Sequence, residues 1–139
     1  MTRVLTLALA QMQPVLGDFE ANLSRIEGMT AEAAVRGANM VIFPELILTG
    51  YHQGLLGERL LTLACTAGDE PIRRLAETAR REKVYLTAGF IQKSRIPGMV
   101  YNAIATFGPE GELLGTNAKS HLFASEKLHF RPGSLPKVM

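Results

Sequence analysis

Three charged side chains have the types and positions that acid–base and oxyanion chemistry requires. Glu45 directly follows a short apolar run, Lys119 follows the last predicted strand, and Glu126 lies seven residues beyond Lys119. Partial removal from water raises the pKa of a carboxyl group, which suits it to act as a general base, and we expect this of Glu45 between Pro44 and Leu46. A lysine beside a reacting carbonyl stabilises the developing oxyanion by about 3–4 kcal/mol.

Each of these residues also has a purely structural interpretation. Glu45 fits equally well a carboxylate that caps a backbone turn or pairs with an arginine. Lys119 and Glu126, taken singly, are typical of solvated surface charges. The spacing alone therefore leaves both interpretations open.

Metal and phosphate sites are not indicated. His52, His121 and His129 lack the spacing of a metal site, and no second kind of ligand clusters with them, so we expect structural or peripheral positions. The glycine-containing segment 108–111 lies between two predicted strands rather than before a helix, unlike a phosphate-binding loop.

Cys65 is the only cysteine, which excludes an internal disulfide and fits a reducing compartment. Residues 60–65 form an apolar stretch that predicts a packed helix. A thiol in such surroundings is usually buried and inert, so we do not expect Cys65 to be the nucleophile.

Composition predicts one globular domain. Hydrophobic residues make up 47% and charged residues 20% of the 139 positions, which allows a packed core. The net charge of +2 is spread among interleaved acids and bases, and tryptophan is absent, so nucleic acid is not an expected partner.

Neither a membrane helix nor a secretory signal is predicted. No apolar stretch approaches the roughly 20 residues that a membrane helix needs. Residues 1–10 contain an early arginine and an apolar run, but the run is at the lower limit for a signal and continues into the domain. We therefore expect residues 4–10 to be a buried strand and the protein to be cytoplasmic.

Hydrophobic spacing predicts alternating strands and helices. Asp18 and Asp69 are suited to begin the helices, with Gly37 after the first and Pro71 early in the second. The predicted elements are a strand at 4–10, a helix at 18–36, a strand at 40–43, a helix from 69, and strands at 84–91, 101–107 and 112–116. This order is typical of an α/β fold in which helices cover one face of a mixed sheet.

Several segments, in this order, resemble the nitrilase superfamily of carbon–nitrogen hydrolases. The matching segments are Ala8-Leu9-Ala10-Gln11, Gly17 through Asn22, Phe43-Pro44-Glu45-Leu46 through Tyr51, Tyr101-Asn102-Ala103, Lys119 through Phe123, and Glu126 through Gly133. The resemblance covers essentially the whole chain and about the first half of such an enzyme.

The resemblance implies a fold and a set of residues. Residues 1–139 would be the N-terminal part of a single hydrolase domain, half of a four-layer αββα sandwich. Glu45 would be the general base, Lys119 the essential lysine and Glu126 the second, positioning glutamate, while Tyr51 would shape the substrate pocket. The nucleophilic cysteine would lie beyond Met139, and no metal or organic cofactor would be needed.

The resemblance also implies a function and partners for the protein. The implied reaction is hydrolysis of a non-peptide carbon–nitrogen bond in a small amide, N-carbamoyl compound or nitrile. The alternative is an inactive truncated relative that acts as a binding or regulatory partner. We expect pairing with a complementary C-terminal half or with further copies, because strand positions would otherwise lie exposed. The candidates are Val4, Leu7, Leu9, Ile42, Leu86, Ala88, Ile104 and Phe107.

Overall fold

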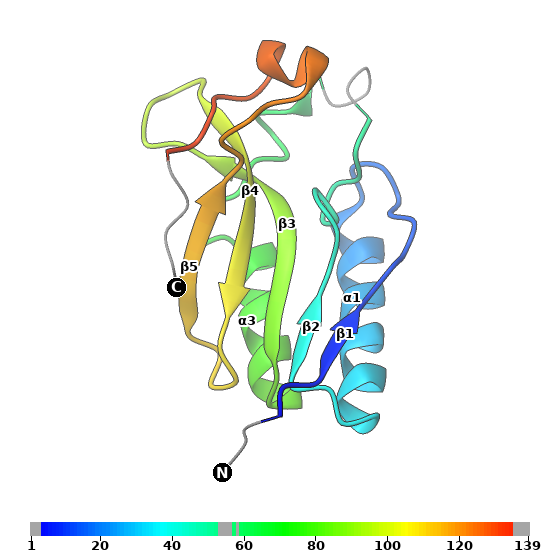
Figure 1. Cartoon of the computed structure of the whole chain (residues 1–139). Coiled ribbons are helices and arrows are strands. Elements are labelled where there is room, and N and C mark those ends of the chain that lie inside the picture. The colour runs from blue at the N-terminus through cyan, green and yellow to red at the C-terminus, as the bar shows by residue number, and fades with distance from the viewer. Residues whose placement is uncertain (1–3, 53–56, 58, 135–139) are drawn as a thin grey trace.

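The fold is one mixed sheet of five strands with two helices on one of its faces (Figure 1). The computed structural model describes residues 4–52, 57 and 59–134. The strands are β1 (Leu7–Leu9), β2 (Met40–Ile42), β3 (Tyr85–Lys93), β4 (Val100–Phe107) and β5 (Leu113–Ala118). The helices are α1 (Phe19–Val35) and α3 (Glu70–Glu82), followed late in the chain by the 3-10 helix η1 (Ala124–Leu128).

The strands lie in the sheet in their sequence order. β1, β2 and β3 are parallel and are connected through α1 and α3, whereas β4 and β5 are antiparallel to their neighbours. The turn between these last strands is closed by Gly108, whose N–H donates to the carbonyl of Glu112 at 2.9 Å. The predicted α/β class and element order are confirmed. The sequence Gly108-Pro109-Glu110-Gly111 predicts a hairpin turn, and this prediction is confirmed as well.

Local sequence explains where the helices begin and end. The Asp18 carboxylate accepts the N–H of Ala21 at 3.0 Å and caps α1, and Gly37 leaves that helix at a φ of 84°. Pro71 occupies the first turn of α3, where its missing N–H leaves no hydrogen bond unmade, and Lys83 ends that helix in the left-handed conformation. The predicted helix starts at Asp18 and Asp69 and the early position of Pro71 are correct, although the Asp69 side chain makes no capping hydrogen bond to α3.

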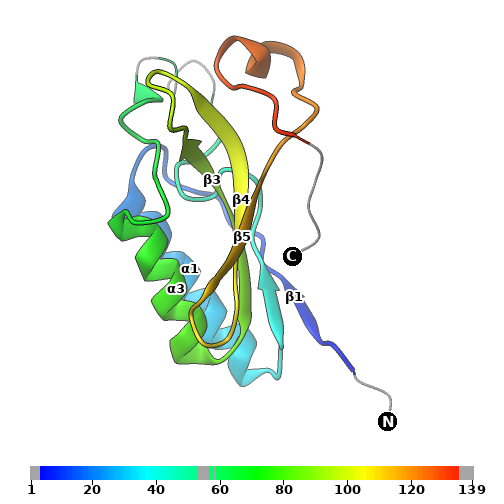
Figure 2. The same ribbon diagram turned by 90° about the vertical axis from the view of Figure 1, so that its left-hand side faces the viewer.

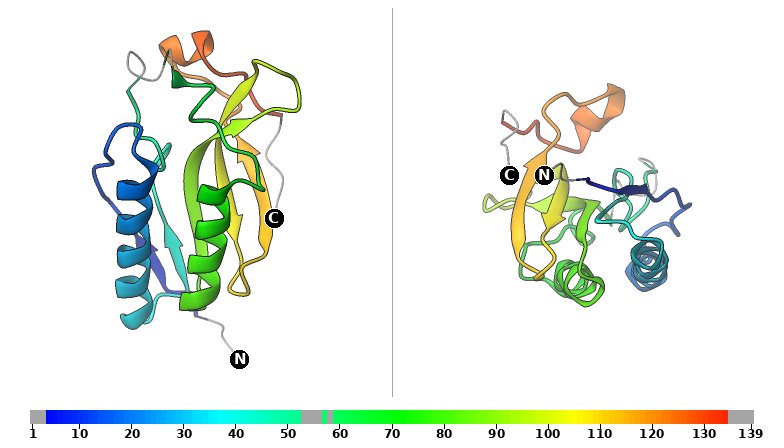
Figure 3. Two further views of the ribbon diagram at one scale, coloured as in Figure 1. Left: turned by 180° about the vertical axis from the view of Figure 1, so that it is seen from behind. Right: turned by 60° about the horizontal axis from the view of Figure 1, so that its bottom comes forward.

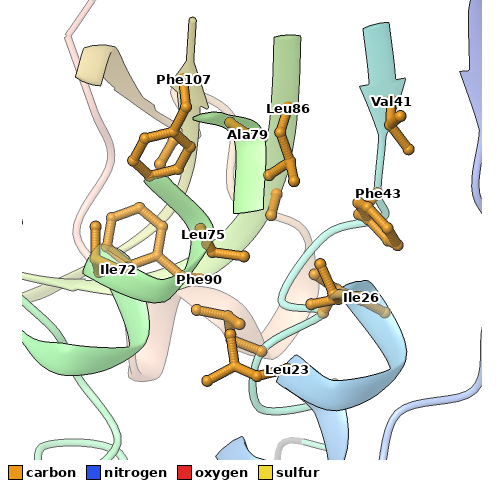
Figure 4. Close-up of a cluster of buried hydrophobic side chains, with 14 of the residues drawn as sticks. Leu23, Ile26, Val41, Phe43, Ile72, Leu75, Ala79, Leu86, Phe90 and Phe107 are labelled. Atoms are coloured by element: carbon orange, nitrogen blue, oxygen red, sulfur yellow. The ribbon is translucent and has the colours of Figure 1, made fainter. Parts of the chain in front are cut away.

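The main core lies between the helices and the sheet (Figure 4). Leu23 of α1 and Leu75 of α3 are fully buried, and they pack with Leu86 and Phe90 of β3. Full burial of a side chain of this size contributes about 1.5–3 kcal/mol. These contacts fix both helices against the same face of the sheet.

Arg74 joins the two helices. Its guanidinium pairs with Glu20 and Glu27 of α1, the latter at 2.9 Å, and its side chain is only 21% exposed. The helical spacing of the sequence after Asp69 predicts that Arg73 and Arg74 both face water. Arg73 is exposed as predicted, but the prediction for Arg74 is wrong, because its long side chain reaches across to α1.

The face of the sheet that lies opposite the helices is not covered at β1. Figures 2 and 3 show both helices on one side of the sheet. Val4, Leu7 and Leu9 are 81%, 50% and 78% exposed, so the prediction of a first strand buried on both faces is wrong in the described chain. β1 is an edge strand, and only Ala8 of these strand residues packs against the core.

The other candidate exposed positions divide between the two faces. Leu86, Ala88 and Phe107 are buried in the core beneath the helices, so their assignment to the uncovered face is wrong. Ile104 is 37% exposed and lies on the open face, as expected. The alternation of side chains along β3 and β4 accounts for this difference.

A second apolar cluster lies apart from the main core. It consists of Leu46, Leu60, Leu63, Ile91, Val100 and Phe130. Residues 60–63 form a turn, and Cys65 pairs with Gln92 of β3 as an isolated parallel bridge, so the predicted packed helix at 60–65 is wrong. Gly50 and Gly54 predict a loop at residues 49–56, and this segment falls partly outside the described residues. Across the described ranges, no helix is long and apolar enough to cross a membrane.

Candidate active site

Glu45 lies in a tight turn that follows β2. Leu46 has a positive φ of 48°, and its carbonyl accepts the N–H groups of Thr49 at 3.1 Å and Gly50 at 2.7 Å. Gly89 of β3 packs against this turn, since a Cβ there would lie 2.4 Å from the Leu46 nitrogen and 2.7 Å from the Pro44 oxygen. The Glu45 side chain is 44% exposed, so the expected desolvation of this carboxylate is not observed.

Lys119 follows β5 and remains attached to the sheet. Its N–H donates to the Asn102 carbonyl at 2.8 Å, and its own carbonyl accepts the N–H of Gly133 at 2.9 Å. Its Nζ donates to Glu45 Oε1 at 2.8 Å and to Glu126 Oε1 at 3.0 Å. The ammonium group therefore lies between the two glutamates.

Glu126 is fully buried in η1. Its Oε2 accepts the Phe123 N–H at 2.6 Å, and its Oε1 accepts the Tyr51 hydroxyl at 2.9 Å in addition to Lys119. A buried carboxylate needs such donors to remain charged. The structural interpretation of Glu126 as a solvated surface charge is therefore excluded.

Asn102 of β4 completes the cluster, and no role was predicted for it from the sequence. It is 3% exposed, and its Nδ2 donates to Glu45 Oε1 and, at 3.2 Å, to Glu126 Oε1. A polar residue at a buried position in an otherwise apolar strand was the available signal. Gly89 was also missed, although an isolated glycine within a strand indicates close backbone approach.

Hydrogen bonding shifts two of the pKa values in the cluster. Burial opposes the charged form of Lys119, but its hydrogen bonds to Glu45 and Glu126 outweigh this effect and raise the pKa of Lys119. Burial would likewise raise the pKa of Glu126, but hydrogen bonds from the Phe123 N–H, Lys119 and Tyr51 together lower it. Both groups are therefore charged at neutral pH.

An open depression lies beside the cluster, between the turn that follows β2 and the C-terminal end of β5. It is lined by Glu45, Asn102, Ala103, Ile104, Asn117, Ala118, Lys119, Ser120 and His121. Polar groups from three segments, at residues 45, 102–104 and 117–121, thus border a partly apolar hollow, the usual setting of a small-molecule site. Tyr51 does not line the depression and contacts the site through Glu126.

Cys65 does not join this cluster. Its side chain is 4% exposed, and burial, followed by the nearby charges of Asp69 and Glu70, raises the pKa of its thiol to about 11. A buried, protonated thiol is a poor nucleophile. Among the described residues, no group of three or more histidine, cysteine or acidic side chains is arranged to hold a metal ion.

Comparison with known protein families identifies the family of this chain. A sequence model described as carbon–nitrogen hydrolase matches residues 6–138. The chain belongs to the carbon–nitrogen hydrolase family. The resemblance identified from the sequence is thereby confirmed.

The individual relatives of this chain carry several names. It is 34% identical over 128 residues to a nitrilase of Pyrococcus abyssi, covering 92% of this chain and 48% of the relative. It is 37% identical over 102 residues to an omega-amidase of Danio rerio, covering 73% and 35%. A citrullinase of Francisella tularensis is 30% identical over 132 residues, covering 91% and 46%.

The fold is also that of solved members of the family. An amidase from Nesterenkonia sp. superimposes with a TM-score of 0.83 at 25% identity, covering 95% of this chain and 49% of that structure. The chain therefore spans about half the length, or less, of the relatives that it matches.

Proposed function

We propose that this chain contributes the general base, the lysine and the positioning glutamate of an enzyme that hydrolyses a non-peptide carbon–nitrogen bond. Glu45, Lys119 and Glu126 have these roles in the order given. The nucleophile is a cysteine outside residues 1–139, which form the N-terminal part of a single hydrolase domain.

The observation that carries the proposal is the position of Lys119 Nζ between two carboxylates, 2.8 Å from Glu45 and 3.0 Å from Glu126. An ammonium group has three N–H donors, and these contacts occupy two of them. The third remains for a substrate oxygen that becomes negatively charged. A surface ion pair would need neither the second carboxylate nor the burial of Glu126.

The Glu45 carboxylate has one oxygen available for proton transfer. Its Oε1 accepts hydrogen bonds from Lys119 and Asn102, whereas its Oε2 accepts none from any residue in the described part of the chain. Oε2 takes the proton of the cysteine thiol. The fixed Oε1 holds the carboxylate in a defined orientation while this happens.

The reaction then proceeds in two stages. The thiolate attacks the carbonyl carbon of an amide or N-carbamoyl group, and Lys119 stabilises the oxyanion. Glu45 returns its proton to the leaving nitrogen, which departs as ammonia or an amine and leaves a thioester. Glu45 next takes a proton from water, the resulting hydroxide attacks the thioester, and the thiol is regenerated with release of the acid. No metal or organic cofactor takes part.

Relatives bear the names nitrilase, omega-amidase and citrullinase, so the proposed substrates to be tested are small nitriles, amides and N-carbamoyl compounds. The exposed Val4, Leu7 and Leu9 support pairing of this sheet with a complementary half or with another copy.

The test begins with the intact mass of the natural protein and peptide sequencing beyond Met139. In the protein so defined, Glu45→Gln and Lys119→Ala are each expected to lower turnover at least 100-fold while the circular dichroism spectrum is unchanged. Arg73→Ala, on an exposed helix face, is the control that retains turnover.

Either of two results would overturn the proposal. A Glu45→Gln or Lys119→Ala enzyme that keeps most of its turnover removes that residue from the mechanism. A natural protein that ends at Met139 and has no partner chain with a cysteine nucleophile is instead a catalytically inactive relative, with a binding or regulatory function.

A further inference from the structure

We propose that Asn102 is a positioning residue that holds the carboxylates of Glu45 and Glu126 on the two sides of the Lys119 ammonium group. This inference rests on the proposed function, because Asn102 acts through the base and not on the substrate. It adds a fourth member to the cluster, contributed by β4, an inner strand of the sheet.

The hydrogen bonds form a closed ring of two donors and two acceptors. Glu45 Oε1 accepts from both Lys119 Nζ and Asn102 Nδ2, and Glu126 Oε1 accepts from the same two nitrogens. A carboxylate that is ionised has no hydrogen to donate, so the amide nitrogen of Asn102, rather than its oxygen, must face both glutamates. Chemistry therefore fixes the orientation of this amide.

The charge balance explains why a neutral donor is suitable at this position. Two carboxylates and one ammonium group give the cluster a formal charge of −1. Asn102 supplies two N–H donors without adding positive charge. A second cation there would favour the ionised form of the neighbouring carboxylates and would oppose proton uptake by a base. The amide thus holds the two acids together and preserves their capacity to accept a proton.

The backbone gives this side chain a rigid base. Asn102 pairs with Ile91 in the register of β3 and β4, and its carbonyl accepts the Lys119 N–H at 2.8 Å. One residue therefore sets the backbone position of Lys119 and, through its side chain, the positions of Glu45 and Glu126. Loss of the amide releases Glu45 most, because Lys119 is then its only remaining donor among the described residues.

The first test replaces Asn102 by a side chain of similar size that cannot donate, Asn102→Leu, in the natural protein. We expect kcat to fall about 10–100-fold with little change in KM, because a displaced base impairs the reaction and not substrate binding. The matched control is Thr106→Val, which lies on the same strand and face, is 8% exposed, and makes its hydrogen bond to Thr87 at 3.1 Å, away from the site.

The second variant, Asn102→Asp, keeps the shape and tests the charge argument even if the leucine variant does not fold. A third carboxyl group in the ring holds a proton at low pH and can then donate one hydrogen bond. It loses that proton as the pH rises. We expect the alkaline limb of the kcat/KM profile to move to lower pH by about one unit or more, whereas Thr106→Val leaves the profile in place.

The proposal is overturned if Asn102→Leu keeps the wild-type kcat, or if Asn102→Asp keeps the wild-type pH profile. Failure of the proposed function is a separate result, in which the wild-type protein hydrolyses none of the substrates. In that case crystal structures of the wild type and Asn102→Leu test the positioning role of Asn102. A displaced Glu45 carboxylate in the variant supports the positioning role, and an unmoved one overturns it.

Discussion

Gly89 lies so close to Leu46 that a Cβ at position 89 would come within 2.4 Å of the Leu46 nitrogen. The neighbouring Pro44 oxygen would lie at 2.7 Å, and both are backbone atoms that cannot rotate away. The turn that carries Glu45 therefore depends on the absence of a side chain on the adjacent strand.

Gly89→Ala is expected to push this turn away from β3 and to lower the free energy of unfolding by about 1–3 kcal/mol, with loss of turnover. Gly28→Ala is the control, because that helical glycine has no atom within 4 Å of its Cβ position and the substitution should stabilise the protein by up to about 1 kcal/mol. Chemical denaturation measures both effects. An alanine at position 89 with wild-type stability and turnover would show that the close approach does not position Glu45.

Glu126 gives the protein a specific acid sensitivity. Its pKa is lower in the folded state than the ordinary value of 4.5, so its ionised form stabilises the fold fully above that pH. This contribution is lost as the pH falls from about 4.5 through the lowered folded-state pKa. Glu126→Gln should be less stable at pH 7 and should show a shallower loss of stability below about pH 4.5.

Denaturation at a series of pH values tests this expectation, with Glu32→Gln as the control because its side chain is 64% exposed in a surface pair with Arg36. Other carboxylates, including Glu20 beside Arg74, retain their own acid dependence. Parallel acid limbs in the wild type and Glu126→Gln would contradict the expectation.

The Cys65 thiol should be almost unreactive in the folded protein. With a pKa of about 11, it is ionised to only about one part in a thousand at pH 8. Iodoacetamide should therefore label Cys65 much more slowly in the native than in the denatured chain, as measured by mass spectrometry. Cys65→Ala should leave turnover of the natural protein unchanged, and a loss of catalysis without a loss of stability would give this thiol a direct role.

The open face over β1 should promote association of the 139-residue chain taken alone. Replacement of Leu7 and Leu9 by lysine removes the apolar surface of this edge strand and should shift the chain toward monomer in sedimentation velocity. Val35→Lys is the control, because Val35 is 88% exposed but belongs to α1. A wild-type chain that is already monomeric and unfolds cooperatively would contradict this expectation.

Elements with strong local signals were predictable from the sequence. Asp18 and Pro71 identify helix starts because they satisfy or avoid unpaired N–H groups, and these effects do not depend on distant parts of the chain. An apolar run such as residues 4–10 does not distinguish an edge strand from a central one, since both require the same residue types. Residues 60–65 are apolar enough for a helix, but Cys65 pairs by both its N–H and its carbonyl with β3.

The charged residues of the candidate site could be predicted from the sequence, but their burial and the hydrogen bonds between them could not. Glu45, Lys119 and Glu126 were identified through the family resemblance, whereas the burial of Glu126 and the exposure of Glu45 depend on how distant segments pack. Asn102 lies 57 positions from Glu45 and 24 from Glu126 in the sequence, and no local pattern relates them. The contact between Asn102 and Glu45 arises only when β2, β3 and β4 are paired.

Leu46 and Phe130 belong to one apolar cluster, and each is connected to one of the two glutamates. Leu46 directly follows Glu45, and the Phe130 N–H donates to the carbonyl of Glu126. Leu46 holds a left-handed backbone conformation that costs about 1–2 kcal/mol, and its complete burial offsets this strain. The two glutamates are thus anchored by a shared packing unit rather than by independent loops. Local opening of either anchor is expected to expose the other, so we expect the amide protons of Gly50 and Phe130 to exchange together as a single cooperative unit.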